Sequence, residues 1–543
     1  MSAAYSSRYP SAFMQAFLLC LFYFLLFFLF NEPVISAFED LHVEYLLSGA
    51  YGQPASLRLH YQYGWHPFLF SPVYALYQWL PKTNWYGIFL ILLQFLAHLL
   101  LLKQVIVQLG IKKAFVFYLL FFLLFGFPFL QKLEIATTSS LLALAASTSL
   151  LFIYKRRVEI NAWLFRKEEL LPIFSLLVAF LLRIHTGLLL LAVFIPIAYL
   201  ATNLRYFKRF SMTALLTIVA SLGLFLVQGK FYEQDPQYIS WKSKSDLYYS
   251  MINRPNTNFV AVDSIQKMES SFILNQYLID SSLITAPKIQ PYVRDISVPT
   301  VLSTAKNNNA LYWTFKNNRL PLLLIAVLLI GSFLAGGNKV FLKSILAVAV
   351  GIATYLGLAL FFKMREHVIL SLSAFVFLSV TLITIRDWKE MRASYSYLLL
   401  GLLISLASWR IIQQSKSRSA LGAQIISTRS FIAAGNKNPG TLYVNLTNEG
   451  WMALGAFDSP NQFQLKNVLT RELLMTGKFL SLFKKFHVED LTNQLVDHPN
   501  IVLLGARQPD WVRYYLWRKG KSIEMVTHPG LKPVPGFQLK SKY

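Results

Sequence analysis

Two adjacent carboxylates, Glu39 and Asp40, follow the first long apolar segment, residues 12–30. A helix of that length can span a bilayer, so we expect both acids to lie where it meets water on its far side. A carboxylate within reach of a hydroxyl can take its proton and speed a transfer reaction by roughly 10²–10⁴-fold. The alternative is that the pair only caps the next helix, because acids are favoured at helix N-termini.

A group of cations, Lys363, Arg365 and His367, stands in a short turn between two apolar runs. Positive charge stabilises a leaving group on which negative charge develops, and arginine offers phosphate a rigid two-pronged donor. We therefore expect Arg365 to be the main phosphate ligand, with Lys363 and His367 beside it. The alternative is a surface ion pair between Arg365 and Glu366 at the membrane interface.

Two further groups of residues could contact a substrate. Arg183 and His185 interrupt the apolar run 170–200, where an ionisable residue is costly and indicates function. Glu134 could equally serve as a buried partner of Arg183. Tyr51 and Tyr63 could stack on sugar rings, or they could belong to the aromatic belt that membrane proteins place at the interface.

The composition predicts an α-helical polytopic membrane protein of about 10–12 membrane helices. The chain has 543 residues, of which 55% are hydrophobic and 14% charged, with a formal net charge of +25. The basic residues lie in short loops between apolar runs, which indicates membrane orientation and argues against nucleic-acid binding. A single cysteine, Cys20, excludes a disulfide framework. The apolar runs are 12–30, 85–107, 113–130, 135–154, 170–200, 211–228, 320–336, 340–362, 367–385 and 394–412.

The basic loops predict a topology with the N-terminus in the cytoplasm. Residues 1–411 then form a membrane domain with outer loops 31–84 and 229–319, and residues 412–543 form a small extracytoplasmic α/β domain. The run 170–200 must begin and end on the same face. We therefore predict a hairpin of two short helices, too short to cross, that meet at residues 183–187.

The C-terminal domain shows the patterns of buried strands and amphipathic helices. Strands are predicted at residues 441–446 and 500–505, and helices at residues 464–486 and 508–519. The domain shows no catalytic signature of its own.

The first outer loop carries a dense motif over residues 31–90 that resembles a group of bacterial membrane glycosyltransferases of the GT-C superfamily. Those enzymes typically carry Asp-Asp, then Ser-Gly-x-Tyr-x-Gly-x-Pro, then Leu-Tyr and Ile-x-Trp-Tyr. The matching residues after Glu39 and Asp40 are Ser48, Gly49, Tyr51, Gly52, Pro54, Tyr63, Gly64, Leu76, Tyr77, Pro81, Asn84, Trp85 and Tyr86. Glu39 stands where the first Asp is usual. Beyond this loop the resemblance rests on the helix layout and on Arg183.

The resemblance implies an enzyme of the bacterial inner membrane that moves a sugar from a polyprenyl-phosphate donor to a cell-envelope glycan or lipid. Asp40 suits the role of base. Glu39 could bind a divalent cation such as Mg²⁺ or Mn²⁺ together with Asp40, orient Asp40, or raise its pKa by repulsion. Two alternatives stay open: a transporter or flippase of a lipid-linked glycan, and an envelope polysaccharide polymerase or ligase that uses the loop 229–319.

Overall fold

The fold is seen in a computed structural model. It describes residues 8–59, 66–156, 166–235, 319–361, 365–385, 387, 393–447, 449–474, 479–489, 491–505, 520, 522–531 and 534–541, together with short pieces between residues 246 and 293.

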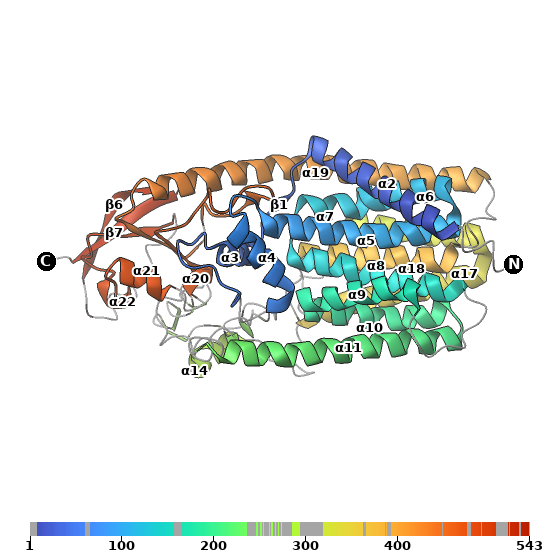
Figure 1. The fold of residues 1–543 in the computed structure, drawn as a ribbon, viewed down its shortest axis with the longest axis horizontal. Coiled ribbons are helices and arrows are strands. Elements are labelled where there is room, and N and C mark those ends of the chain that lie inside the picture. Colours follow the sequence, from blue (N-terminus) through green and yellow to red (C-terminus); the bar gives the residue numbers. More distant parts are fainter. Residues whose placement is uncertain are drawn as a thin grey trace.

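A bundle of long helices forms one part of the molecule, and a mixed sheet lies beyond one end of it (Figure 1). Eight segments within the described residues are long and apolar enough to cross a membrane. The chain is thus a polytopic helical membrane protein, as its composition predicts. The bundle consists of α2 (Arg8–Phe30), α5 (Trp85–Leu109), α6 (Ile111–Phe121) with its continuation α7 (Phe127–Gln131), α8 (Ile135–Arg156), α9 (Lys167–Leu182), α10 (Ile184–Ala201), α11 (Leu204–Glu233), α17 (Arg319–Phe361), α18 (Glu366–Thr384) and the first half of α19 (Ala393–Asn436).

Helix α8 is the centre of the bundle. Every residue from Ile135 to Tyr154 is buried. Much of this helix is Ala, Ser and Thr, and small side chains let neighbouring membrane helices approach closely. The hydroxyl of Ser139, near the start of α8, donates to the carbonyl of Ala179 in α9 at 2.8 Å. The first turns of α8 and the end of α9 therefore lie at the same level of the bundle.

The apolar run 170–200 is broken at Arg183, within the predicted stretch. Arg183 has an extended backbone (φ −157°, ψ 95°) between the end of α9 and the start of α10. The two helices run side by side in Figure 1. The prediction that both helices are too short to cross is wrong for α10, because its 18 residues are one of the eight candidate spans.

Helix α17 consists of two helical segments that meet at Gly337. This residue has φ 64° and ψ −162°, a backbone conformation that only glycine adopts easily. Pro321, near the start of α17, and Tyr355, near its end, line the same small cavity. The two segments therefore fold back on each other, which agrees with the separate apolar runs 320–336 and 340–362.

The C-terminal region contains a five-stranded sheet in the order β4-β2-β5-β7-β6. β2 (Leu442–Asn445) pairs in parallel with β4 (Val468–Thr470) and β5 (Ile501–Leu504). β7 (Val534–Ser541) is antiparallel to β5 and to β6 (Ile523–Leu531). The strands predicted at 441–446 and 500–505 are thus confirmed as β2 and β5.

The predicted helix at residues 464–486 is wrong over its first part. β4 occupies residues 468–470, followed by the short helices α20 (Arg471–Leu474) and α21 (Leu480–Lys485). All three residues of β4 are buried, so pairing with β2 and burial of this apolar triplet override its helical pattern. The helix predicted at 508–519 lies outside the described residues. The expected domain boundary at residue 411 falls inside α19, which continues unbroken to Asn436.

The first outer loop joins the bundle to the C-terminal region by backbone pairing. β1 (Val34–Ile35) is antiparallel to β3 (Leu454–Gly455). The carbonyl of Val34 also accepts from the N–H of Leu133, just before α8, at 2.8 Å. Beyond β1, α3 (Phe38–Ser48) and α4 (Pro67–Trp79) lie between bundle and sheet (Figure 1).

The contact of α5 with the C-terminal region leaves no space for a side chain at Gly87. A Cβ atom there would lie 2.2 Å from the carbonyl oxygen of Ala456, whereas a Cβ at Gly401 of α19 would meet nothing within 4 Å. We expect Gly87→Ala to lower the melting temperature in detergent because backbone would have to shift. Gly401→Ala should be neutral or stabilise by up to about 1 kcal/mol. Equal effects of the two changes would contradict this close packing.

Candidate active site

A polar cavity of about 240 Å³ lies where the first turns of four helices, α3, α8, α10 and α18, come together. The first N–H groups of a helix have no partner within the helix and carry partial positive charge. Four such ends around one space favour a bound anion. The residues that line it are Ala37, Glu39, Asp40, Pro128, Lys132, Glu134, Ala136, Thr137, Arg183, Arg365, Glu366, His367, Leu370, Arg410 and Gln414.

Asp40 lies in the wall of this cavity with only 4% of its surface exposed. Its Oδ1 accepts hydrogen bonds from the hydroxyl of Tyr86 and, at 2.9 Å, from the N–H of Ile135. Burial raises the pKa of Asp40 to about 8; the nearby Glu134 and Glu39 act in the same direction, and the two hydrogen bonds oppose the shift. A carboxyl that releases its proton near neutral pH is well matched to acid–base chemistry.

Asp40 does have a capping contact, but with a different helix from the expected one. The N-cap of α3 is Ala37, which makes no side-chain cap bond. The N–H that Asp40 accepts belongs instead to Ile135, the first residue of α8. Asp40 therefore joins the start of α3 to the start of the central helix.

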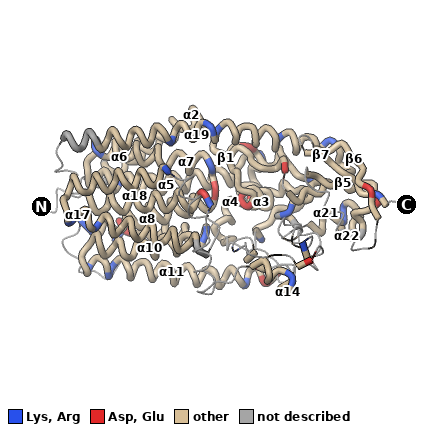
Figure 2. The backbone as a smooth tube through the Cα atoms, turned by 180° about the vertical axis from the view of Figure 1, so that it is seen from behind, with Lys and Arg blue, Asp and Glu red and all other residues tan. Residues whose placement is uncertain are grey.

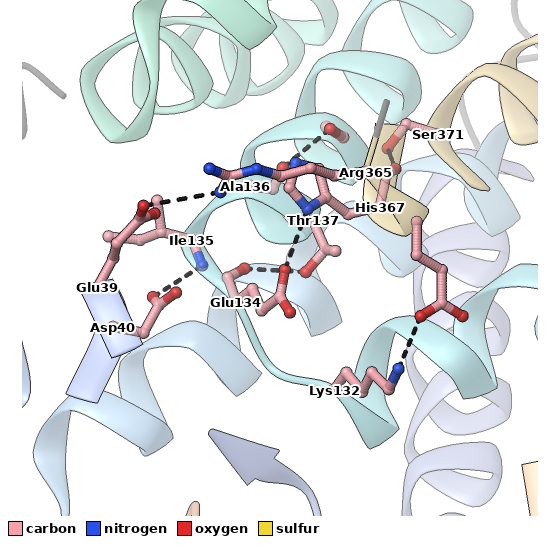
Figure 3. A network of polar contacts seen from close by, with 12 residues as sticks. Glu39, Asp40, Lys132, Glu134, Ile135, Ala136, Thr137, Arg365, His367 and Ser371 are labelled. Atoms are coloured by element: carbon pink, nitrogen blue, oxygen red, sulfur yellow. Dashed lines mark hydrogen bonds and ion pairs between the residues drawn. The ribbon is translucent and has the colours of Figure 1, made fainter. Parts of the chain in front are cut away.

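Three ion pairs cross the cavity (Figure 3). Lys132 Nζ lies 2.7 Å from Glu366 Oε2, and His367 Nδ1 lies 3.5 Å from Glu134 Oε2. Arg365 Nη1 lies 3.7 Å from Glu39 Oε1. The alternative pairing of Arg365 with Glu366 is therefore wrong, because Glu366 pairs with Lys132. The structure instead brings Arg365 to the predicted carboxylate pair.

The other predicted site residues have different positions. Arg183 lines the cavity, whereas His185 is exposed and does not. Tyr51 is buried at 2% exposure and does not line the cavity, because its hydroxyl bonds His42 Nδ1 at 2.8 Å and its ring packs towards Trp451. Stacking of a sugar on Tyr51 is thus contradicted. Lys363 and Tyr63 lie outside the described residues.

Lys132, Arg410 and Gln414 line the cavity as well, although they were not predicted as site residues. Lys132 and Glu134 interrupt two long apolar runs, 113–130 and 135–154, and such a polar junction at a helix end was the available signal. Arg410 stands inside the last apolar run, in the same way as Arg183 does in the fifth. No local pattern indicates that α19 approaches the first outer loop.

Two further cavities follow the polar cavity between α17, α18 and α19. A second cavity of about 270 Å³ shares Glu366, Leu370 and Arg410 with the first and adds Arg319 and Trp409. A third, smaller cavity between α17 and α18 shares Pro321, Ile369 and Ser373 with the second, and its surface is almost wholly apolar. The three cavities are thus neighbours that share lining residues, and the third of them is apolar.

Asn84 connects the C-terminal region to the helix that carries Asp40. Its Nδ2 donates to Glu44 Oε1 at 2.6 Å and to the carbonyl of Asp458 at 3.0 Å. Glu44 follows Asp40 by four residues and so lies on the same face of α3. Burial raises the pKa of Glu44 well above its usual value. A neutral Glu44 can be retained there without an opposing cation.

A second chain of hydrogen bonds leads from Asn84 back to Asp40. Asn84 Oδ1 accepts from the Tyr77 hydroxyl at 3.2 Å, and the same hydroxyl accepts from the backbone N–H of Tyr86 at 3.1 Å. The Tyr86 side chain in turn donates to Asp40. The sequence indicated Asn84 only as part of the motif over residues 31–90 and gave it no role of its own. Asn84 is the N-cap of α5, a position at which asparagine is favoured.

Comparison with known proteins gives two matches, both to solved structures. No family model matches the chain, and no curated protein matches it. The crystal structure of ArnT from Cupriavidus metallidurans bound to undecaprenyl phosphate is 11% identical, covers 99% of this chain and 98% of that chain, and has a TM-score of 0.41. The apo structure of the same protein is 12% identical, covers 96% and 97%, and has a TM-score of 0.41.

We expect Asn84→Ala to loosen α3. The change removes the donor that Glu44 and Asp458 share, and an orphaned buried polar group costs about 1–3 kcal/mol. Hydrogen exchange should therefore quicken in residues 38–48. Asn467→Ala is the matched control, because the buried Asn467 Nδ2 bonds only carbonyls of the C-terminal region, those of Gly435, Asn438 and Thr441. Unchanged exchange of α3 in Asn84→Ala, or the same change in Asn467→Ala, would contradict the connection.

Proposed function

We propose that this protein is an integral membrane glycosyltransferase that moves a sugar from a polyprenyl-phosphate donor to a glycan or lipid acceptor of the cell envelope. One observation carries the proposal: the buried carboxyl of Asp40 faces a cavity that is built for an anion and adjoins an apolar groove. A base, a phosphate site and a path for a lipid tail are the parts that this reaction needs.

The phosphate of the donor would bind among the helix N-termini and the cations of the cavity. Arg365 is held by Glu39 at 3.7 Å, a long contact between side chains that are 38% and 20% exposed. Such a pair in partial contact with solvent is weak, so a phosphate can take over the guanidinium. Arg183, Lys132 and Arg410 line the same cavity and supply further positive charge where the leaving group forms.

The chemical step is a displacement at the anomeric carbon of the sugar. The acceptor hydroxyl loses its proton to the ionised carboxylate of Asp40 while its oxygen bonds to the anomeric carbon. The bond from that carbon to the phosphate oxygen breaks, and polyprenyl phosphate leaves with the electron pair. The helix N-termini and Arg365 stabilise the charge on that oxygen.

The isoprenoid tail would lie in the groove between α17 and α18. That groove leads away from the polar cavity and becomes almost wholly apolar at Ile325, Ile352 and Leu372. Burial of apolar surface is worth about 25 cal/mol per Å², so the tail would supply much of the donor's binding energy. Specific contacts to the phosphate would add to this energy and fix the position of the phosphate.

Glu39 and Asp40 also suit a divalent cation in the presence of donor. Mg²⁺ is commonly held by one or two carboxylates together with phosphate oxygens and water. No group of three or more His, Cys, Asp or Glu side chains within the described residues could hold a metal by itself. The donor phosphate would therefore have to complete the coordination.

The cavity would face the outside of the inner membrane, with the N-terminus in the cytoplasm and the C-terminal region outside.

Asp40→Asn tests the proposal most directly. The amide keeps the size of the side chain but cannot accept a proton, so turnover with a polyprenyl-phosphate sugar should fall by roughly 10²-fold or more. Wild-type activity should rise as the pH passes about 8, the pKa of Asp40, because only the ionised form is a base. Asp497→Asn, a change at the far end of the C-terminal sheet, is the control. Full activity of Asp40→Asn would exclude the carboxylate mechanism and favour a transporter.

The same carboxyl gives a separate stability measurement. Folded protein holds the Asp40 proton more tightly than unfolded protein does, because the pKa is raised to about 8 from 3.8. The free energy of unfolding should therefore fall as the pH rises between these two values. Asp40→Asn should flatten this slope, whereas Asp497→Asn should not.

Glu39→Gln, assayed in parallel with Asp40→Asn, should lose activity. It should regain activity at high Mg²⁺ if Glu39 is a cation ligand.

Arg365→Ala should raise the KM for the donor. A charge-assisted hydrogen bond to phosphate is worth roughly 1.5–3 kcal/mol, which corresponds to an increase of about 10- to 150-fold. Arg418→Ala, at an exposed arginine of α19 that does not line the cavity, controls for the loss of one positive charge. A wild-type KM in folded Arg365→Ala protein would show that the donor phosphate binds elsewhere.

A further inference from the structure

A second groove lies at the opposite end of the bundle from Asp40. It has a volume of about 300 Å³ and lies among the end of α5, the start of α6, α18 and α19. Helix α5 begins beside Asp40 and ends at Leu109, at the mouth of this groove, so its 25 residues place the mouth about 37 Å from Asp40 at 1.5 Å per residue. The floor of the groove is nearer, because Leu403 of the floor and Arg410 of the polar cavity stand on the same helix, α19. The groove has no part in the chemistry proposed for Asp40.

The floor of this groove is hydrocarbon. It is formed by Phe117 and Leu120 of α6, Phe377 of α18 and Leu403 of α19, all of which are buried. The rings of Phe117 and Phe377 pack with their centroids 5.5 Å apart. An apolar wall of this kind suits an acyl chain and offers little to a free, hydrated anion.

The mouth of the groove carries two lysines, Lys112 and Lys113, in the first turn of α6. Both are exposed, and neither lies within ion-pair distance of an acid in the described part of the chain. Lysine and arginine also predominate over acids around this end of the bundle in Figure 2. Among the described residues, the positive charge at the mouth therefore has no acidic partner within ion-pair distance, and it is complementary to a negative headgroup.

We propose that this groove binds one acidic phospholipid from the leaflet at this end of the bundle. Its headgroup phosphate contacts Lys112 and Lys113, and one acyl chain lies over Phe117 and Phe377. Basic side chains at the end of a transmembrane helix attract anionic lipid, and the apolar floor adds the specificity that free basic residues lack. The bound lipid would join α6 to α18 and α19.

The test is lipid-dependent thermal stability of the purified full-length protein, with native mass spectrometry to count bound lipid. Phosphatidylglycerol should raise the melting temperature more than phosphatidylcholine does and should remain bound. The double change Lys112→Gln and Lys113→Gln should abolish that difference. The double change Lys339→Gln and Lys343→Gln, which removes the same charge from the second segment of α17 outside the groove, should preserve it.

Two further arms separate the lipid from other sources of phosphate. Leu403→Trp fills the floor of the groove and keeps both lysines, so it should abolish the effect of phosphatidylglycerol. If that variant does not fold, Leu400→Trp takes its place, because Leu400 lies at the half-buried edge of the groove. Inorganic phosphate and glycerol phosphate should have no effect. Retention of the lipid effect in the Lys112 and Lys113 variant, or an equal effect of free phosphate, would overturn the proposal.

Discussion

The buried carboxyl of Asp40 is the point on which the rest of the site depends. It accepts from Tyr86 of α5 and from the first N–H of α8, so one side chain of α3 holds together the starts of three helices. Because those bonds oppose the effect of burial, the pKa reaches only about 8. Burial without these bonds would raise the pKa further, and full solvation would make the carboxylate a weak base.

The neighbouring charges follow from the same geometry. A cavity where helices begin is already positive, and acids are needed there to balance it while the substrate is absent. Glu39 and Glu366 each pair with a cation across the space, and Glu134 lies 3.5 Å from His367. These exposed or half-buried pairs are individually weak, so an entering anion can exchange partners without leaving a charge buried alone.

Local chemistry predicted part of this arrangement. The break at Arg183 follows from a charge inside an apolar run. Arg365 was expected on the same face of the membrane as Asp40, whereas its pairing with Glu39 was not predicted. Other features depend on contacts between segments far apart in the sequence, and no local pattern indicates them. They are the positions of Lys132 and Arg410 in the cavity wall and the connection through Asn84. Asn84 and Asp458, for example, are more than 300 residues apart. The helix predicted over residues 468–470 was wrong for a related reason, because Val468 and Leu469 of β4 pair with β2.

Helix α19 runs from the bundle to the sheet without a break. Arg410, in its first half, lines the polar cavity, and Arg429, in its second half, pairs with Asp458 beside β3. About 28 Å of continuous helix separates them. If this helix rotated by about 5° around one of these residues, the other residue would move by about 2.5 Å over this length. That displacement is close to the length of a hydrogen bond. A displacement of the sheet would therefore reach the wall of the cavity through α19.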